Sequence, residues 1–180
     1  ALDRAPMRLD AYEGLSRGFM LFDEFERAVM EYKKLAIVNP VGKWKYYFAI
    51  GDFFASQGQM PEARAFWNRV AERAFTDATL YFRLGTRYYW AEQTDQAFEM
   101  LRKAIDLHPD EYRYHLALGN ILADQKKFAE AIHEYREALK LSTQTMLLPV
   151  RRTMSEVQIN FAHELYTQEK YKESLDVYEE

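Results

Sequence analysis

Apolar residues recur along the chain with the spacing of helices that bury one side. Within residues 78–91, Tyr81, Leu84 and Tyr88 are separated by three and then four residues, which places them on one face of a helix. A short polar turn follows, and small and apolar residues then continue with helical spacing over 94–107. The pattern predicts two amphipathic helices joined by a tight turn.

This two-helix pattern repeats along the chain. An apolar residue followed by glycine occurs at intervals of 34 residues, and a series of alanines follows twelve positions later with the same interval. The two series are Gly51, Gly85 and Gly119, and Ala63, Ala97 and Ala131. A shared period of this length predicts a tandem two-helix repeat, in which small side chains let the paired helices approach closely.

The same spacing extends in both directions and divides the chain. Small residues stand at the equivalent positions of the outer repeats, for example Ser16 near the start and Ala162 near the end. We expect a segment of a longer repeat protein, because the first residues match the end of a repeat and the last ones stop inside a helix. The predicted parts are the end of a preceding repeat (1–8), repeats at 9–43, 44–77, 78–111 and 112–145, an insertion (146–154), and an incomplete fifth repeat (155–180).

The spacing, the small residues and the aromatic residues around them resemble the tetratricopeptide repeat (TPR) family over nearly the whole chain. The resemblance implies an all-α fold, a right-handed superhelical solenoid of antiparallel helix pairs with about five repeats. It also implies that most of the aromatic side chains are core residues of the repeats.

Composition narrows the class of protein further. The chain has 180 residues, of which 48% are hydrophobic and 29% charged, so it is a folded protein. It has no cysteine, which excludes disulfides and leaves the compartment open between the cytoplasm, which we favour, and an extracytoplasmic space such as the periplasm. A net charge of −4 with mixed signs argues against nucleic-acid binding, and no apolar run is long enough for membrane insertion.

Motifs for catalysis and cofactor binding are missing from the sequence. It contains no glycine-rich phosphate loop and no short motif of a known hydrolase or metalloprotease. Glu130 and His133 have the Glu-x-x-His spacing of di-iron bundles, but such a site needs a second copy and two further glutamates. We interpret both as solvent-facing, and predict no catalytic residue, no metal site and no cofactor.

In the resembled family, the first helix of each repeat lines a concave groove that holds a partner peptide. Some members bind an acidic carboxyl terminus through a set of Lys, Arg and Asn side chains in the groove. When this set is aligned from the first repeat of the chain, only Arg83 agrees, so this mode of binding is poorly matched. The groove positions hold an apolar row, Phe48, Phe82, Leu116 and Ile159, with Asp52, Arg83, Thr86, Tyr89 and Asn120 beside it. The alternative is that the neighbouring helix partly buries this row.

Two classes of function remain open. The first is a protein-interaction scaffold that binds a partner peptide or helix in the groove. The second is a structural spacer or self-assembly arm of a larger complex, for example an export, secretion or enzyme assembly. The last helix supports the second, because Leu175 and Tyr178 begin an inward face that nothing follows, which predicts self-association through uncapped ends.

Overall fold

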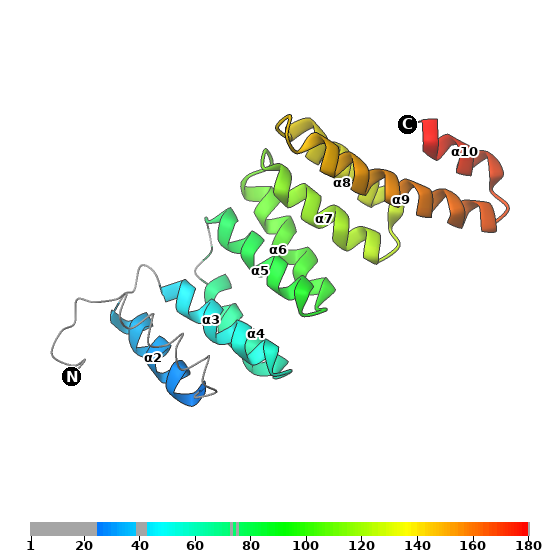
Figure 1. Ribbon diagram of the computed structural model, residues 1–180. Helices are drawn as coiled ribbons and strands as arrows, with labels where there is room; N and C mark the ends of the chain where they lie inside the picture. Colours follow the sequence, from blue (N-terminus) through cyan, green and yellow to red (C-terminus); the bar gives the residue numbers. More distant parts are fainter. Residues whose placement is uncertain (1–24, 39–42, 73, 75, 180) are drawn as a thin grey trace. The chain divides into compact units, whose positions relative to one another are not determined.

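A computed structural model of the chain describes residues 25–38, 43–72, 74 and 76–179, and all regular structure in them is helical (Figure 1). The predicted segment 1–8 and the first helix of the first predicted repeat lie outside the described residues. The helices are α2 (Phe25–Val38), α3 (Lys43–Ser56), α4 (Met60–Ala71), α5 (Ala78–Trp90), α6 (Thr94–Leu107), α7 (Tyr112–Asp124), α8 (Phe128–Leu141), α9 (Leu147–Thr167) and α10 (Tyr171–Glu179).

The helices form two compact units, residues 1–75 and 76–180. In the first unit, α3 packs against both α2 and α4. In the second unit, the consecutive pairs α5–α6, α7–α8 and α9–α10 are helical hairpins, and each pair packs on the next through α6–α7 and α8–α9. The first helices α5 and α7 also touch each other.

Glycine at the predicted close-contact position is required by space. A Cβ atom added to Gly85 would lie 2.8 Å from Cγ of Leu101, and one added to Gly119 would lie 2.7 Å from Cε1 of Tyr135. In the first unit the equivalent atom on Gly51 would collide with the ring of Trp67. Each glycine therefore receives the large side chain that the second helix of its hairpin carries, and this contact fixes how closely the two helices pack.

The turn inside each hairpin ends the first helix with a residue of positive φ. These residues are Gly58, Glu92, Lys126 and Glu169, with φ between 58° and 73°. In the α7–α8 hairpin, the amide of Lys126 donates to the carbonyl of Ala123, and the amide of Lys127 donates to that of Leu122. The same two bonds recur in the other hairpins. This is the Schellman helix end, for which glycine is the favoured residue. The turn therefore keeps its geometry where the sequence has lost the glycine.

The segment 146–154 is helical from Leu147 onward and is continuous with the first helix of the last hairpin. Pro149 is tolerated there because the first turn of a helix has no internal acceptor for its amides. Val150 is fully buried, so the added turns of α9 contribute a core residue.

Candidate partner-binding face

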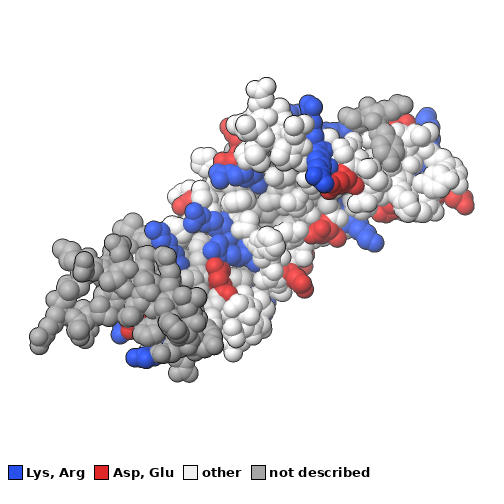
Figure 2. Space-filling model, in the orientation of Figure 1, with Lys and Arg blue, Asp and Glu red and all other residues white. Residues whose placement is uncertain are grey.

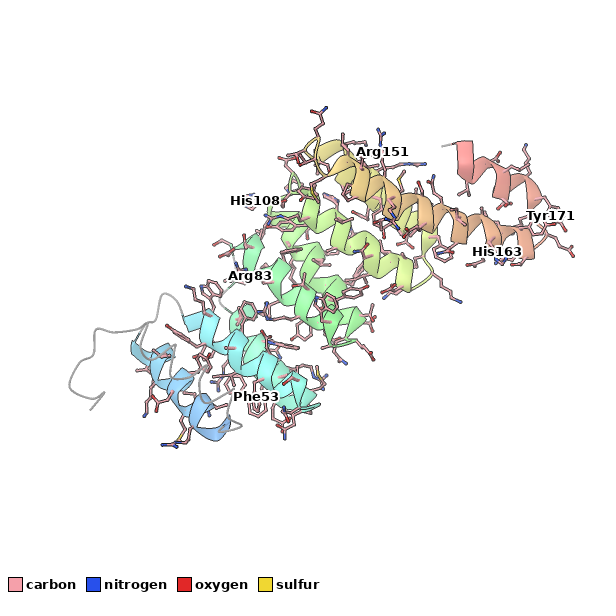
Figure 3. All side chains as sticks on the ribbon, in the orientation of Figure 1. Phe53, Arg83, His108, Arg151, His163 and Tyr171 are labelled. Carbon is pink, nitrogen blue, oxygen red and sulfur yellow. The ribbon has the colours of Figure 1, made fainter. Side chains whose placement is uncertain are left out.

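The first helices of the second unit carry most of the groove residues expected from the sequence. Thr86 and Tyr89 on α5 are half-buried, whereas Arg83 is exposed (Figure 3). Leu116 and Asn120 on α7 are half-buried, and Ile159 on α9 is 54% exposed. We call the surface formed by these side chains, together with Phe82, the first-helix face: Phe82, Arg83, Thr86, Tyr89, Leu116, Asn120 and Ile159.

The two phenylalanines of the apolar row are held by other aromatic rings. Phe82 on α5 is half-buried, and its ring centroid lies 5.0 Å from that of the buried Tyr114 at the start of α7. Phe48 in the first unit is 3% exposed and meets Trp44 edge-on at 5.9 Å. Phe82 therefore links two repeats while keeping part of its surface open, whereas Phe48 is buried.

Two polar groove residues orient buried aromatic side chains. The indole Nε1 of Trp67 donates to Oδ1 of Asp52 over 3.1 Å, and the hydroxyl of Tyr135 donates to Oδ1 of Asn120 over 2.8 Å. Trp67 and Tyr135 are also the rings that lie over Gly51 and Gly119. Asp52 and Asn120 thus satisfy the polar ends of the side chains that pack their hairpins. The sequence pattern assigned these two residues to the groove and gave no sign of this second role.

Tyr89 connects the first helices of adjacent repeats. Its hydroxyl donates to Oδ2 of Asp124, at the end of α7, over 2.6 Å. Partial burial, the hydrogen bond to Asp124 and the negative charge of that carboxylate raise the pKa of Tyr89 to about 12. Burial, with Asp124 nearby, also raises the pKa of Tyr135. Tyr89 therefore stays a neutral hydrogen-bond donor at every physiological pH.

Exposed aromatic residues flank the first-helix face. Trp90, the last residue of α5, is 84% exposed, and Tyr166 near the end of α9 is 61% exposed. Trp90 stands at a repeat position that the resemblance assigns to the groove, whereas Asp124 was not expected there. Periodicity alone could not select Asp124, because its importance depends on a bond between different repeats.

Charges of both signs are interspersed on the face of the molecule shown in Figure 2. The part of the chain with described coordinates contains no group of three or more His, Asp or Glu side chains placed to hold a metal ion. None of the helices in that part has the length and hydropathy to cross a bilayer.

A buried polar pair that the sequence did not reveal lies between α7 and α8. Nδ1 of His115 on α7 is 2.7 Å from Oε2 of Glu134 on α8, and its Nε2 is 2.9 Å from the carbonyl oxygen of Pro109. Because that carbonyl can only accept, Nε2 carries a proton, and one further proton lies between Nδ1 and Glu134. Both residues are 8% exposed. The pair therefore ties the loop before α7 to α8, and its role is structural.

Comparisons with known proteins agree with this architecture. A sequence profile described as tetratricopeptide repeat matches residues 82–144. The chain has the tetratricopeptide repeat fold. It matches no curated protein sequence.

Three solved structures illustrate the likeness of this fold to others. A MamA fragment from Desulfovibrio magneticus is 14% identical with a TM-score of 0.60, and the match covers 96% of this chain and 92% of that one. YrrB is 17% identical with a TM-score of 0.60, covering 98% and 86%. The C-terminal part of a TPR protein from Cytophaga hutchinsonii is 19% identical with a TM-score of 0.66, covering 93% and 65%. At these identities the likeness shows the fold.

Proteins with this fold are generally non-enzymatic scaffolds for protein interactions.

Proposed function

We propose that this protein is an interaction scaffold that binds a segment of a partner protein on the first-helix face. The observation that carries the proposal is a row of apolar side chains at the same position of three successive first helices, Phe82, Leu116 and Ile159, flanked by the exposed rings of Trp90 and Tyr166. Apolar groups that are at least partly exposed and recur at repeat spacing suit a helix or an extended peptide, whose own side chains are also periodic.

YrrB, which has a similar fold, is described as a TPR protein with an unusual peptide-binding site, and this supports the proposal. A second support is the rigidity of the surface. The Phe82–Tyr114 contact and the Tyr89–Asp124 bond each join α5 to α7, so a partner would meet a preorganised surface.

The test uses a displayed library of random dodecapeptides, since the partner is unidentified. Peptides selected on the wild-type chain are expected to bind the double variant Phe82→Ser, Leu116→Ser at least about tenfold more weakly, because two apolar contacts are lost. The matched control, Glu130→Ser with His133→Ser on the exposed side of α8, is expected to bind as wild type. Affinity is measured by fluorescence anisotropy with labelled peptides.

Circular dichroism must show that the groove variant is folded, because Phe82 also packs on Tyr114. If it is not, Leu116→Ser with Ile159→Ser replaces it, since Ile159 is more than half exposed. The proposal would be contradicted if the selected peptides bound the folded first-helix-face variant normally and lost affinity for the control variant Glu130→Ser, His133→Ser.

A second candidate function, self-assembly, is favoured by the surface of α10. Tyr171 is 53% and Leu175 is 66% exposed, four residues apart on one side of the helix. If this surface joins copies of the chain, sedimentation velocity should show concentration-dependent association across a hundredfold range, and Leu175→Glu should abolish it. A wild-type chain that stays monomeric over the whole range would eliminate this function.

A further inference from the structure

Trp90 and Asp124 hold equivalent places in adjacent repeats. Each is the last residue of its first helix, α5 or α7. Tyr89 lies between them, since its ring centroid is 6.3 Å from that of Trp90 and its hydroxyl is bonded to Asp124. The three side chains therefore form a continuous strip, the Trp90–Tyr89–Asp124 strip, along the ends of two neighbouring helices.

Asp124 gives this strip a carboxylate that no ion pair within the described part of the chain neutralises. Asp124 makes no ion pair there, and the bond from Tyr89 occupies one of its two oxygens. The last turn of α7 contains no basic residue, and a helix C-terminus is itself partially negative. A carboxylate at this place opposes the helix dipole, so it is an unfavourable choice for the stability of α7 alone.

The aromatic half of the strip is equally without a charged partner. Several rings elsewhere in this chain have a Lys or Arg over their face, among them Phe66, Phe98 and Tyr81. No described cation lies over Trp90, although it is the most exposed large apolar side chain of the described residues. The adjacent turns carry Glu92 after α5 and Lys126 and Lys127 after α7, and the ammonium group of Lys127 lies over the ring of Phe98.

We propose that the Trp90–Tyr89–Asp124 strip binds a lysine or arginine side chain of the partner segment, and so selects basic peptides among those that the first-helix face accepts. The apolar stem of the cation would lie on the indole ring, and its charged end would meet the free oxygen of Asp124. A cation at the ends of α5 and α7 also complements both helix dipoles. This inference rests on the proposed function, because the strip borders the apolar row that would hold the rest of the segment.

The test compares peptides selected from the dodecapeptide library on wild type and on Asp124→Asn. The substitution removes the charge and keeps an oxygen that can accept the bond from Tyr89. In the peptides selected on wild type, lysine or arginine is expected to be enriched at one position. In the peptides selected on Asp124→Asn, this enrichment should be absent. Replacing that residue by glutamine should weaken binding to wild type roughly fivefold, and binding to Asp124→Asn less than about twofold.

Two further variants distinguish a contribution of the strip from that of the rest of the first-helix face. Trp90→Ala is expected to reduce the preference for the basic residue in the same way, whereas the charge control Glu130→Gln, on α8, should leave it unchanged. Melting temperatures must show each variant folded. One outcome would contradict the role of the strip and still support binding on the first-helix face. In it, wild type binds the basic and the glutamine peptides equally well, and the double variant Phe82→Ser, Leu116→Ser binds neither. Selected peptides that bind this groove variant normally overturn the proposed function itself.

Discussion

Replacing Gly119 by alanine should lower the free energy of unfolding by about 2 kcal/mol, although alanine is the better helix former. The added Cβ would lie 2.7 Å from Cε1 and 2.9 Å from Cδ1 of Tyr135, inside contact distance. The ring cannot easily move, because Tyr135 is 1% exposed and its hydroxyl is bonded to Asn120. The hairpin must therefore open or the ring must leave its rotamer. Urea denaturation followed by circular dichroism measures the change.

The control for this prediction removes the obstacle. In a chain that carries Tyr135→Ala, the same Gly119→Ala change should cost less than about 0.5 kcal/mol, or stabilise the helix, because no ring remains to be displaced. The difference between the two backgrounds measures the glycine–ring contact itself. If Gly119→Ala unfolds at the same urea concentration as wild type, the close approach of α7 and α8 is not needed for stability.

The glycine and alanine series could predict this contact because its cause is local. The two helices of a hairpin meet at a fixed separation in the sequence, so a steric need at one point appears as a small residue in each repeat. The TPR fold followed from these two series. The departures from glycine at Glu92, Lys126 and Glu169 did not alter the turns, because hydrogen bonding at the helix end keeps the left-handed residue in place.

The candidate site was less accessible to prediction. The spacing places Phe48 and Phe82 at the same repeat position, yet Phe48 is buried and Phe82 is half-buried, since exposure depends on neighbouring residues that have no period. Asp52 and Asn120 bond buried rings because the second helix carries Trp67 and Tyr135, and where it carries Leu101 no such bond exists. Asp124 became visible only through its bond to a tyrosine 35 residues away.

The buried pair of His115 and Glu134 gives a second large effect. The substitution Glu134→Ala should lower the free energy of unfolding by about 3 kcal/mol, because it leaves Nδ1 of a buried imidazole without a partner. The bond from Nε2 to Pro109 fixes the ring, so the imidazole cannot turn to water without releasing the loop before α7. An exposed pair on the same helix is the matched control. Removing Glu137, which pairs with Lys140, should cost less than about 0.5 kcal/mol.

The double variant His115→Phe, Glu134→Leu distinguishes a structural need for the pair from the cost of breaking it. It should be within about 1 kcal/mol of wild type, because apolar groups of similar volume remove both the attraction and the desolvation of the polar groups. At the positions equivalent to His115 the two preceding repeats have Tyr81 and Tyr47, so phenylalanine suits the site. Urea denaturation of both single variants, the double variant and wild type gives the coupling between the two residues. If the double variant is as unstable as Glu134→Ala, the hydrogen bond from His115 to the carbonyl of Pro109 is what stabilises this part of the fold. The mutual pairing of the buried carboxylate and imidazole would then not be the source of the stability.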